Sequence, residues 1–527
     1  MPPYAIGLDF GTESARLVLI DTSNGSELLV CDQSYRHGVI DQALPNGRRL
    51  PAEWALQHPA DYLAATETLL RAAAEAVDAT QIIGIGIVFP ASTVLPVRAD
   101  GTPLCMVAEF AGEPHAYVKL WKHHAAAAEA AVITASGGRF LEHTGGDTSP
   151  EWLHAKALET MNHAPHVFAA AERFLEAGDW LVWQLCGREV RSACQAGFKA
   201  HYRGGYPAAA DLDAIASGFG ALNSRLAEPQ AVGTCAGGLM AAWAERSGVP
   251  AGTPVGVAVI DAHAAVPGLG VTGAGVLAIA MGTSTCHILL AEHEQLKPGI
   301  AGVVYEGVYP GLYAYETGQA AAGDMLAWWV RLLAGEPNES MHYDELEAAA
   351  AQLAPGGRGI LALDWWNGAR TPLMDPLLSG VLVGLRVETQ PAEIYRALLE
   401  AIAFGNRQVI ELLEAATGPI REVRVGGGLS RSTLLMQILA DVCGREILVS
   451  PTPHASARGA AIYGALAAGI GSVADVCARM APHDLTRYAP TTAHTALYHR
   501  RYALYRELQR HFGEGGSDLL YRLRSGT

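Results

Sequence analysis

Two short polar turns of similar sequence are the first candidates for chemistry in this chain. Gly11-Thr12-Glu13-Ser14 and Gly282-Thr283-Ser284-Thr285 each lie between two apolar, strand-like runs. A tight turn exposes consecutive backbone N–H groups, and its glycine lets a phosphate group approach the backbone closely. Either turn alone is more simply an ordinary hairpin turn, in which Gly, Thr and Ser are common. Two such turns, 271 residues apart in a chain of 527, favour phosphate binding.

Two aspartates stand at the ends of apolar runs. Asp9 precedes the first turn, where its carboxylate could hold Mg²⁺ directly or through water, because Mg²⁺ prefers oxygen ligands and keeps much of its hydration. An Asx contact that stabilises the turn is the alternative. Asp261 follows the apolar run 255–260, at a place where open α/β sheets bind ligands, and there it could act as a general base. The alternative for Asp261 is a helix N-cap.

A triple glycine and a lone acid complete the candidates. Gly426-Gly427-Gly428 stands between a strand-like and a helix-like segment, so a flat ring such as adenine could lie on its backbone, although a tight turn is equally compatible. Glu316 is flanked by uncharged residues, which predicts partial burial. Buried acids need hydrogen-bond partners, and a polyol or a structural contact would supply them.

Several familiar motifs are absent from the sequence. No lysine follows a glycine, so there is no GxxxxGK[ST] phosphate loop, and neither a His-Arg-Asp kinase loop nor an HExxH metal motif occurs. Gly268–Gly273 matches GxGxxG, but a strand-like run follows it where a dinucleotide site needs a helix. A flexible interdomain turn is the better interpretation.

Composition excludes other classes of protein. The net charge is −16 and half of the residues are hydrophobic, which argues against a nucleic-acid binder, a basic membrane-surface protein and disorder. The eight cysteines form no CxxC pair. The N-terminus does not resemble a signal peptide, and the apolar stretch 255–281 is interrupted by Asp261, His263 and Pro267, so we expect a cytoplasmic protein with no membrane span.

The elements that must position these residues alternate between strands and helices. The pattern predicts an α/β fold of two domains that each begin with a hairpin, divided near 268–275 into residues 1–268 and 269–527. The expected helices cover residues 59–76, 125–133, 393–415, 432–443 and 494–511, and the expected strands include 82–88 and 423–425.

Taken together, these pieces resemble the FGGY family of carbohydrate kinases, and within it the bacterial ribulokinases, from about residue 6 to residue 511. The match is carried by ordered stretches: Gly7–Thr12, Leu120–His124, Glu151-Trp152, Ala196–Lys199, Asp261–Pro267, Met281–Ser284, Glu316–Gln319, Leu363–Gly368, Gly427–Leu429, Gln437 and Ala440-Asp441. The resemblance implies the actin/hexokinase-like (ribonuclease H-like) fold with an interdomain cleft. It also implies an ATP- and Mg²⁺-dependent kinase of a ketopentose, with L-ribulose to L-ribulose 5-phosphate in L-arabinose catabolism as the expected reaction.

The resemblance also implies roles for single residues. Asp261 would take the proton of the sugar's terminal hydroxyl, and Asp9 would organise Mg²⁺. The first domain would form the sugar side and the second the nucleotide side. The remaining implied contacts are Lys199, Glu316 and the backbone near Ala91 to the sugar, the turn residues Gly11, Thr12, Ser14, Gly282, Thr283 and Ser284 to the ATP phosphates, and Gly427 and Gly428 to the adenosine.

One departure from the family pattern affects the choice of sugar. Val88 and Pro90 stand where the ribulokinase pattern has an Asp and a Thr, in a segment that borders the family's sugar pocket. Another ketose or polyol (D-ribulose, ribitol, xylulose) therefore stays open as substrate. A non-catalytic sugar or nucleotide sensor on the same fold is the other alternative, and Asp261 argues against it because a sensor needs no base. The sequence leaves the oligomeric state open, a homodimer included.

Overall fold

The computed structural model describes residues 3–334 and 339–525, which form two compact units. The first unit comprises residues 1–272, 303–314 and 454–482, and the second comprises 273–302, 315–453 and 483–527. The first break lies within the stretch 268–275 in which the sequence predicts the domain boundary. Two segments of the second half, 303–314 and 454–482, nevertheless pack within the first unit.

The first unit is built on a sheet with the strand order β11-β12-β5-β1-β2-β3, with β13 beside β5. Strands β1 and β2 form the predicted hairpin, and β5 and β13 run parallel to β1. The strands of this sheet are β1 (Tyr4–Phe10), β2 (Ser14–Asp21), β3 (Glu27–Ser34), β5 (Ile82–Phe89), β11 (Cys235–Gly238), β12 (Pro254–Gly256) and β13 (Val259–Ile260). Because β1, β5 and β13 are parallel, their carboxyl ends meet at one edge of the sheet.

Helices and a smaller sheet complete the first unit. The smaller sheet has the order β4-β7-β6-β8 and consists of β4 (Leu56–Gln57), β7 (Val118–Lys119), β6 (Val94–Val97) and β8 (Arg173–Glu176). The helices are α1 (Pro59–Ala76), α2 (Ala127–Ala135), α3 (Leu153–His163), α4 (Pro165–Ala170), α5 (Ala177–Cys186), α6 (Ala193–Lys199), α7 (Ala209–Ile215), α8 (Ala241–Ser247), α9 (Asp261–Gly268), α14 (Ala455–Ala467) and α15 (Val473–Met480). Short strands β9 (Arg191–Ser192) and β10 (Pro229–Gln230) pair with each other, and β16 (Gly302–Tyr305) lies in the inserted segment 303–314.

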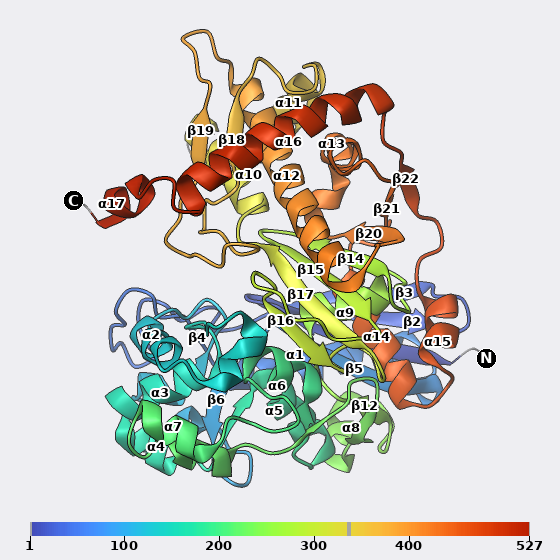
Figure 1. Cartoon of the computed structure of the whole chain (residues 1–527). Coiled ribbons are helices and arrows are strands. Elements are labelled where there is room, and N and C mark those ends of the chain that lie inside the picture. Colours follow the sequence, from blue (N-terminus) through green and yellow to red (C-terminus); the bar gives the residue numbers. More distant parts are fainter. Residues whose placement is uncertain (1–2, 335–338, 526–527) are drawn as a thin grey trace. The chain divides into compact units, whose positions relative to one another are not determined.

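Helix α14 approaches strand β5 and helix α9 at backbone distance, because glycines stand at the contacts (Figure 1). A Cβ atom added at Gly86 of β5 would lie 1.8 Å from the carbonyl oxygen of Ala460. On the helix itself, a Cβ atom at Gly459 would lie 1.7 Å from the carbonyl oxygen of Ala264 in α9. Only a hydrogen atom fits at these positions. The glycines therefore allow α14 to pack closely against β5 and α9.

The second unit repeats the arrangement of the first sheet. Its sheet contains the order β17-β15-β14-β20-β21-β22, in which β14 and β15 form the second predicted hairpin and β20 runs parallel to β14. These strands are β14 (Val276–Met281), β15 (Thr285–Ala291), β17 (Tyr313–Gln319), β20 (Glu422–Gly426), β21 (Ile447–Val449) and β22 (Thr486–Tyr488), and a separate pair is β18 (Leu361–Leu363) with β19 (Val381–Val383). The helices are α10 (Gly323–Ala334), α11 (Glu339–Ala351), α12 (Pro391–Thr417), α13 (Thr433–Cys443), α16 (Thr492–Gly513) and α17 (Leu519–Ser525).

The predicted helices and strands are confirmed to within a few residues, and the α/β class with them. The start of helix α12 can be predicted from its sequence. Gln390 and Glu393 form a capping box, and Pro391 takes the first helical position, where its missing N–H has no helical partner to lose. Helix α13 begins after Ser432, whose hydroxyl accepts a hydrogen bond from the N–H of Leu435 at 3.0 Å.

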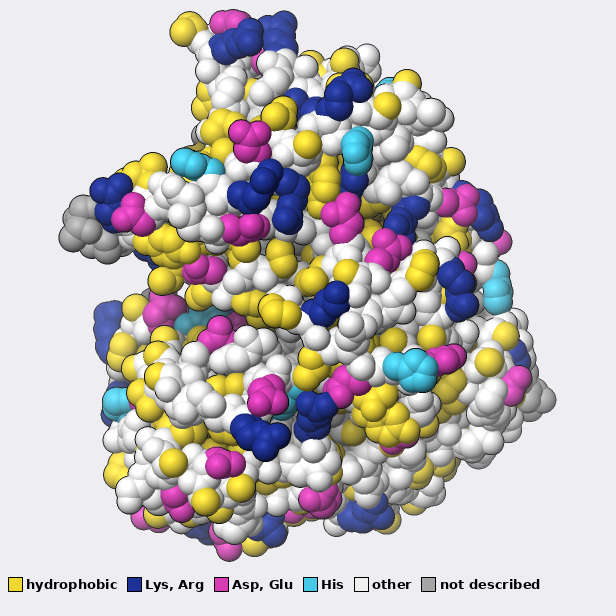
Figure 2. All heavy atoms as spheres, viewed as in Figure 1, with side chains coloured by type: hydrophobic (Ala, Val, Ile, Leu, Met, Phe, Trp, Pro, Cys, Tyr) yellow, Lys and Arg dark blue, Asp and Glu magenta, His cyan; other side chains and the backbone are white. Residues whose placement is uncertain are grey.

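The surface carries charges of both signs. On the face drawn in Figure 2, Lys and Arg side chains alternate with Asp and Glu, and the described part of this face shows no extended patch of one sign. Among the described residues, no helix has the length and apolar character that crossing a membrane requires.

Three histidines of the first unit are buried near one another. The rings of His143 and His154 lie 6.0 Å and 5.4 Å from the ring of His201. Both ring nitrogens of His154 have no hydrogen-bond partner among the described residues. Burial therefore penalises the protonated form and lowers the pKa of His154 to about 4.

We predict that Gly86→Ala destabilises the protein strongly. The added methyl group meets a carbonyl oxygen of α14 that cannot turn aside, so the free energy of unfolding should fall by about 3 kcal/mol or more. Denaturant unfolding measures this. Gly205→Ala is the control, because a Cβ atom there has no neighbour within 4 Å, and it should change stability by less than about 0.5 kcal/mol. Equal effects of the two substitutions would contradict the packing account.

We also predict a loss of stability in acid that involves His154. Its pKa is about 4 in the folded protein and about 6.5 in the unfolded chain, so its contribution is complete above pH 6.5 and is lost as the pH falls toward 4. A shift of this size corresponds to about 3 kcal/mol. Melting temperatures measured from pH 7 to pH 4 should fall less steeply for His154→Phe than for the wild type. An unchanged slope would show that His154 takes up no proton on unfolding.

Candidate active site

The first Gly-Thr turn closes the hairpin at the edge where the parallel strands end. The N–H of Gly11 donates to the carbonyl oxygen of Ser14 at 2.8 Å. Gly11, Thr12 and Ser14 are all partly exposed, so the turn reaches the surface of the first unit. The segment is therefore an ordinary hairpin turn, as the simpler interpretation predicts. Because it is partly exposed, it is also accessible to a ligand.

Side chains from distant segments hold Thr12 in place. The amide Nε2 of Gln57 donates to the carbonyl oxygen of Thr12 at 2.7 Å, and the Tyr62 hydroxyl donates to Oε1 of Gln57 at 2.5 Å. The indole Nε1 of Trp121 donates to Oγ1 of Thr12 at 3.2 Å. The sequence assigned no role to these three residues. Trp121 lies in the Leu120–His124 stretch of the family resemblance, which is the only signal that pointed to it.

Asp9 and Asp261 lie at the same edge as the first turn. Asp9 is the penultimate residue of β1, and Asp261 follows β13 directly as the first residue of α9. Ile260 occupies the N-cap position, so the N-cap alternative for Asp261 is off by one residue. Oδ1 of Asp261 accepts the N–H of Ala262 at 2.6 Å, and an acid in the first turn suits the positive end of the helix dipole.

The two carboxylates influence each other. Burial, together with the nearby charge of Asp261, raises the pKa of Asp9 to about 7, and the guanidinium of Arg16 opposes this shift. Arg16 is itself paired with Asp32, with 2.8 Å between Nε and Oδ1. The edge therefore concentrates negative charge, which favours a cation there.

The first unit also contains two of the expected sugar contacts. Ala91 lies in the loop that follows β5, and so at the carboxyl edge of the sheet. Lys199 is the last residue of α6 and is only 8% exposed, with its Nζ 5.7 Å from the centre of the Trp152 ring. This lysine is therefore largely shielded from solvent at the end of its helix.

The third expected sugar contact, Glu316, belongs to the second unit. It lies on β17 and is partly exposed, and its carbonyl oxygen accepts the N–H of Ala301 at 3.0 Å. The partial burial that the sequence predicts for Glu316 is confirmed.

The second Gly-Thr turn and the triple glycine meet at one edge of the second sheet. Ala280 of β14 pairs in parallel register with Gly426 of β20, so the residues that follow both strands are neighbours. Gly427 has a φ of +100°, and a Cβ atom there would lie 2.4 Å from the carbonyl oxygen of Met281. A Cβ atom at Gly428 would meet nothing within 4 Å, so the space above this residue is open.

The second turn is fixed by the start of helix α10. The N–H groups of Ala322 and Asp324 donate to the carbonyl oxygen of Thr283 at 2.8 and 3.2 Å, and the N–H of Gly323 donates to that of Gly282 at 3.1 Å. Gly282 and Thr283 stay exposed. The structure thus places side by side two candidates that the family resemblance assigns to one ligand, ATP.

Several known proteins are similar to this chain in sequence over nearly its whole length. A model of the C-terminal domain of the FGGY family of carbohydrate kinases matches residues 277–468. The ribulokinase of Halalkalibacterium halodurans is 44% identical over 99% of this chain and 97% of its own length. That of Mycolicibacterium smegmatis is 40% identical over 99% of this chain and 96% of its own length. The chain belongs to the FGGY family of carbohydrate kinases.

Solved structures agree with this family in fold. A xylulose kinase from Rhodospirillum rubrum covers 96% of the FGGY chain with a TM-score of 0.80 at 24% identity, and 98% of its own chain is matched. A glycerol kinase from Plasmodium falciparum covers 96% with a TM-score of 0.76 at 16% identity, with 98% of its own chain matched. The chain is an ATP-dependent sugar kinase, and the non-catalytic sensor is not favoured.

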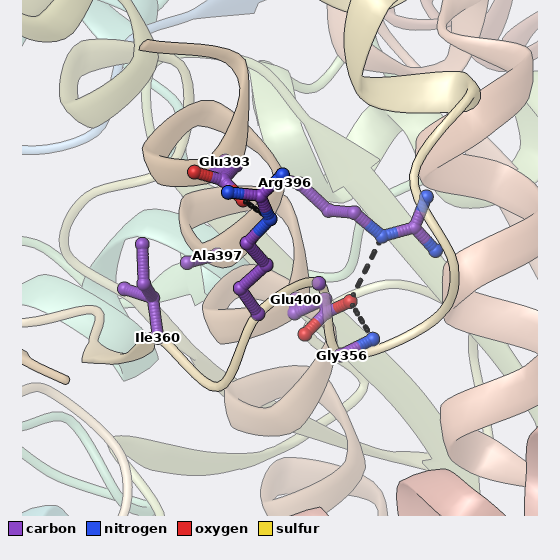
Figure 3. Close-up of a pocket in the computed structure, with 8 residues that line it drawn as sticks. Gly356, Ile360, Glu393, Arg396, Ala397 and Glu400 are labelled. Carbon is purple, nitrogen blue, oxygen red and sulfur yellow. Dashed lines mark hydrogen bonds and ion pairs between the residues drawn. The ribbon is translucent and has the colours of Figure 1, made fainter. Parts of the chain in front are cut away.

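A small surface depression in the second unit of the FGGY chain lies apart from these edges and is lined by residues of α12 and of the loop 356–360 (Figure 3). Its polar groups already bind one another: Glu400 accepts the N–H of Gly356 at 2.8 Å and the Nε of Arg396 at 3.1 Å. Tyr498 also donates to Glu400, at 3.0 Å. These contacts anchor a loop to α12, and they leave little hydrogen-bonding capacity for a ligand.

A metal site formed by protein ligands alone requires several ligating side chains close together. Within residues 3–334 and 339–525, no group of three or more His, Cys, Asp or Glu side chains is arranged to hold a metal ion. This fits an ion such as Mg²⁺ that is bound by one or two carboxylates and otherwise by water and phosphate.

Proposed function

We propose that this kinase transfers the γ-phosphoryl group of ATP to the terminal hydroxyl of L-ribulose, which gives L-ribulose 5-phosphate and ADP. The observation that carries the proposal is the similarity to ribulokinases, at 40–44% identity over nearly the whole chain in several relatives. Because those relatives share the name of one activity, the ketopentose is favoured over other sugars. We place the enzyme in the cytoplasm, within L-arabinose catabolism.

In the proposed reaction, the Asp261 carboxylate accepts the proton of the attacking hydroxyl. The sugar oxygen forms a bond to the γ-phosphorus, the bond from that phosphorus to the β,γ-bridging oxygen breaks, and ADP leaves with the bond's electron pair. The position of Asp261 at the first turn of α9 supports this role, since the carboxylate stands at the edge of the sheet where ligands bind. Positioning and charge neutralisation, more than covalent chemistry, lower the barrier of phosphoryl transfer.

Backbone amides would hold the ATP phosphates. We assign this role to the turns at Gly11, Thr12 and Ser14 and at Gly282, Thr283 and Ser284, and the adenosine to Gly427 and Gly428. Their exposure and the open space above Gly428 support the assignment. Asp9 would hold Mg²⁺, which supplies neutralisation of phosphate charge when it is bound.

Lys199, Glu316 and the backbone of Ala91 would bind the sugar. Val88 and Pro90 are the residues of this region that leave the exact sugar open. Val88 is buried, and its Cα pairs in register with that of Asp9 on the neighbouring strand. Val88 is uncharged, so it adds no further negative charge beside Asp9. Its presence in place of the Asp of the family pattern is therefore compatible with catalysis.

The experiment that tests the function is sugar-stimulated ADP release from the purified protein with Mg-ATP. The panel consists of L-ribulose, D-ribulose, ribitol, L-arabitol, D-xylulose and no sugar. We expect kcat/KM to be highest for L-ribulose. A preference for another member of the panel would keep the kinase and replace its substrate, whereas no stimulation by any sugar would refute the proposal.

We predict that Asp261→Asn lowers kcat by about 10²–10⁴-fold, because the amide cannot accept the proton. The KM for ATP should stay within about threefold, since no phosphate contact is removed. Asp32→Asn is the matched control: it removes one negative charge from the same neighbourhood, but Asp32 is half-exposed and paired with Arg16. Near-normal turnover of Asp261→Asn would exclude Asp261 as the base.

We predict that Asp9→Asn raises the Mg²⁺ concentration required for half-maximal rate by at least about tenfold. The physical reason is the loss of the anionic oxygen ligand that Asp9 would supply to the ion. A magnesium titration at saturating ATP and sugar measures it, again with Asp32→Asn beside it. An unchanged magnesium requirement would argue for a purely structural Asp9.

A further inference from the structure

The loop between β5 and β6, residues 90–93, contains a strained residue. Ser92 has a φ of +61°, in the left-handed region that residues with a Cβ atom rarely adopt. Its side chain is 1% exposed, and its Oγ has no hydrogen-bond partner among the described residues. The serine side chain therefore does not hold this conformation, and contacts to the backbone of the loop must do so.

Lys156 supplies one of these contacts. This residue of α3 is fully buried, and its Nζ donates to the carbonyl oxygen of Ser92 at 2.6 Å. The other two donors reach the carbonyl oxygens of Leu120, at 2.8 Å, and Lys119, at 3.3 Å. All three ammonium protons are thus used on backbone oxygens. Burial lowers the pKa of Lys156 to about 7, and the charges of Glu176 and Glu151 oppose this shift. The lysine side chain ties the loop 90–93 to the segment that follows β7.

Glu176 holds the same loop from the other side. It ends β8, and its Oε2 accepts the N–H of Thr93 at 2.7 Å. The neighbouring N–H of Ala177 donates to the carbonyl oxygen of Thr93, also at 2.7 Å. Burial raises the pKa of Glu176, and the charges of Lys156 and Lys199 act in the opposite direction. Lys156 and Glu176 therefore bind the two polar groups of the same peptide bond, the Ser92 carbonyl oxygen and the Thr93 N–H.

We propose that Lys156 and Glu176 are positioning residues for sugar binding, because they fix the backbone of Ala91 and Ser92 in the conformation that meets the substrate. The inference rests on the proposed function, in which the backbone of Ala91 contacts the sugar. Neither side chain needs to touch the substrate. Their effect reaches it through Ser92, whose strained backbone relaxes when its carbonyl oxygen loses the ammonium group.

Lys119 shows that burial of a lysine alone does not imply this role. It is 2% exposed and lies beside Lys156, but its Nζ donates to Glu159 at 2.6 Å, Thr160 at 2.7 Å and the carbonyl oxygen of Lys156 at 3.0 Å. None of these partners belongs to the loop 90–93. The two lysines match in type, burial and region, and differ in whether they hold the loop.

The test compares Lys156→Met with Lys119→Met by steady-state ADP release, with the favoured sugar and Mg-ATP. For Lys156→Met we expect the KM for sugar to rise at least about tenfold, because displacement of a binding group by a fraction of an ångström has effects of this size. The KM for ATP should stay within about threefold for both variants, and so should the sugar KM of Lys119→Met. Melting temperatures should fall for both, since each loses buried hydrogen bonds.

The outcomes separate the inference from the function on which it rests. A wild type that responds to sugar, together with an unchanged sugar KM in Lys156→Met, overturns the inference alone. An equal rise of sugar KM in Lys119→Met also overturns it, because general loosening of the region would then be the cause. A wild type that no sugar stimulates overturns the proposed function and the inference together.

A rescue experiment distinguishes positioning from general stabilisation. Glycine adopts a φ of +61° without steric cost, so adding Ser92→Gly to Lys156→Met should recover at least about threefold of the lost sugar KM. No recovery overturns the assignment of Ser92 as the point of action. If Lys156→Met does not fold, Glu176→Gln replaces it: its neutral amide accepts the Thr93 N–H more weakly, and the sugar KM should rise about threefold or more. An unchanged sugar KM in Glu176→Gln then overturns the inference.

Discussion

The close contact of helix α14 with strands β1 and β5 and with helix α9 is the constraint on which the first unit depends. At Gly7, Gly86 and Gly268, a Cβ atom would lie 1.8–2.0 Å from a carbonyl oxygen across the contact. Such packing brings backbones together without the adjustment that side chains allow. Helix α9 begins with Asp261, and β1 ends beside Asp9. The close packing of α14 against both elements therefore also determines the positions of these two carboxylates.

The parallel strands explain why the other candidate site residues lie together at one edge of each sheet. In each unit a hairpin supplies a Gly-Thr turn, and a strand parallel to the first strand of that hairpin ends beside it. The loop with Ala91 follows that strand in the first unit, and Gly427 follows it in the second. Both edges thus present exposed turn backbone, and Asp9 and Asp261 stand at the first of them. In the proposed reaction, backbone amides would hold the anionic phosphates and these two acids would serve the metal and the proton.

The sequence predicts the local elements well, and it misses what depends on contacts between distant segments. The hairpins, the capped start of α12 and the turn glycines are encoded by residues a few positions apart, so they can be read directly. Gln57, Lys156 and Glu176 each act on residues 36–83 positions away, and nothing around them distinguishes them from ordinary core residues. Trp121 acts on Thr12, 109 positions away, and only its place in the family resemblance pointed to it. The contact of the second turn with the triple glycine is likewise not readable from local sequence, and only the family resemblance linked the two segments. Val88 and Pro90 were singled out only because a family pattern was available for comparison.

The return of residues 454–482 to the first unit has a consequence for the order in which the chain is made. After residue 272 leaves the ribosome, another 210 residues must be synthesised before this unit is complete. At about 5–20 residues per second, that interval is roughly 10–40 s. Throughout that interval, β1 and β5 lack helix α14, which packs against their glycines. The first unit therefore stays incomplete until residues 454–482 have been synthesised, and a division of the chain near residue 272 would remove part of the core of this unit.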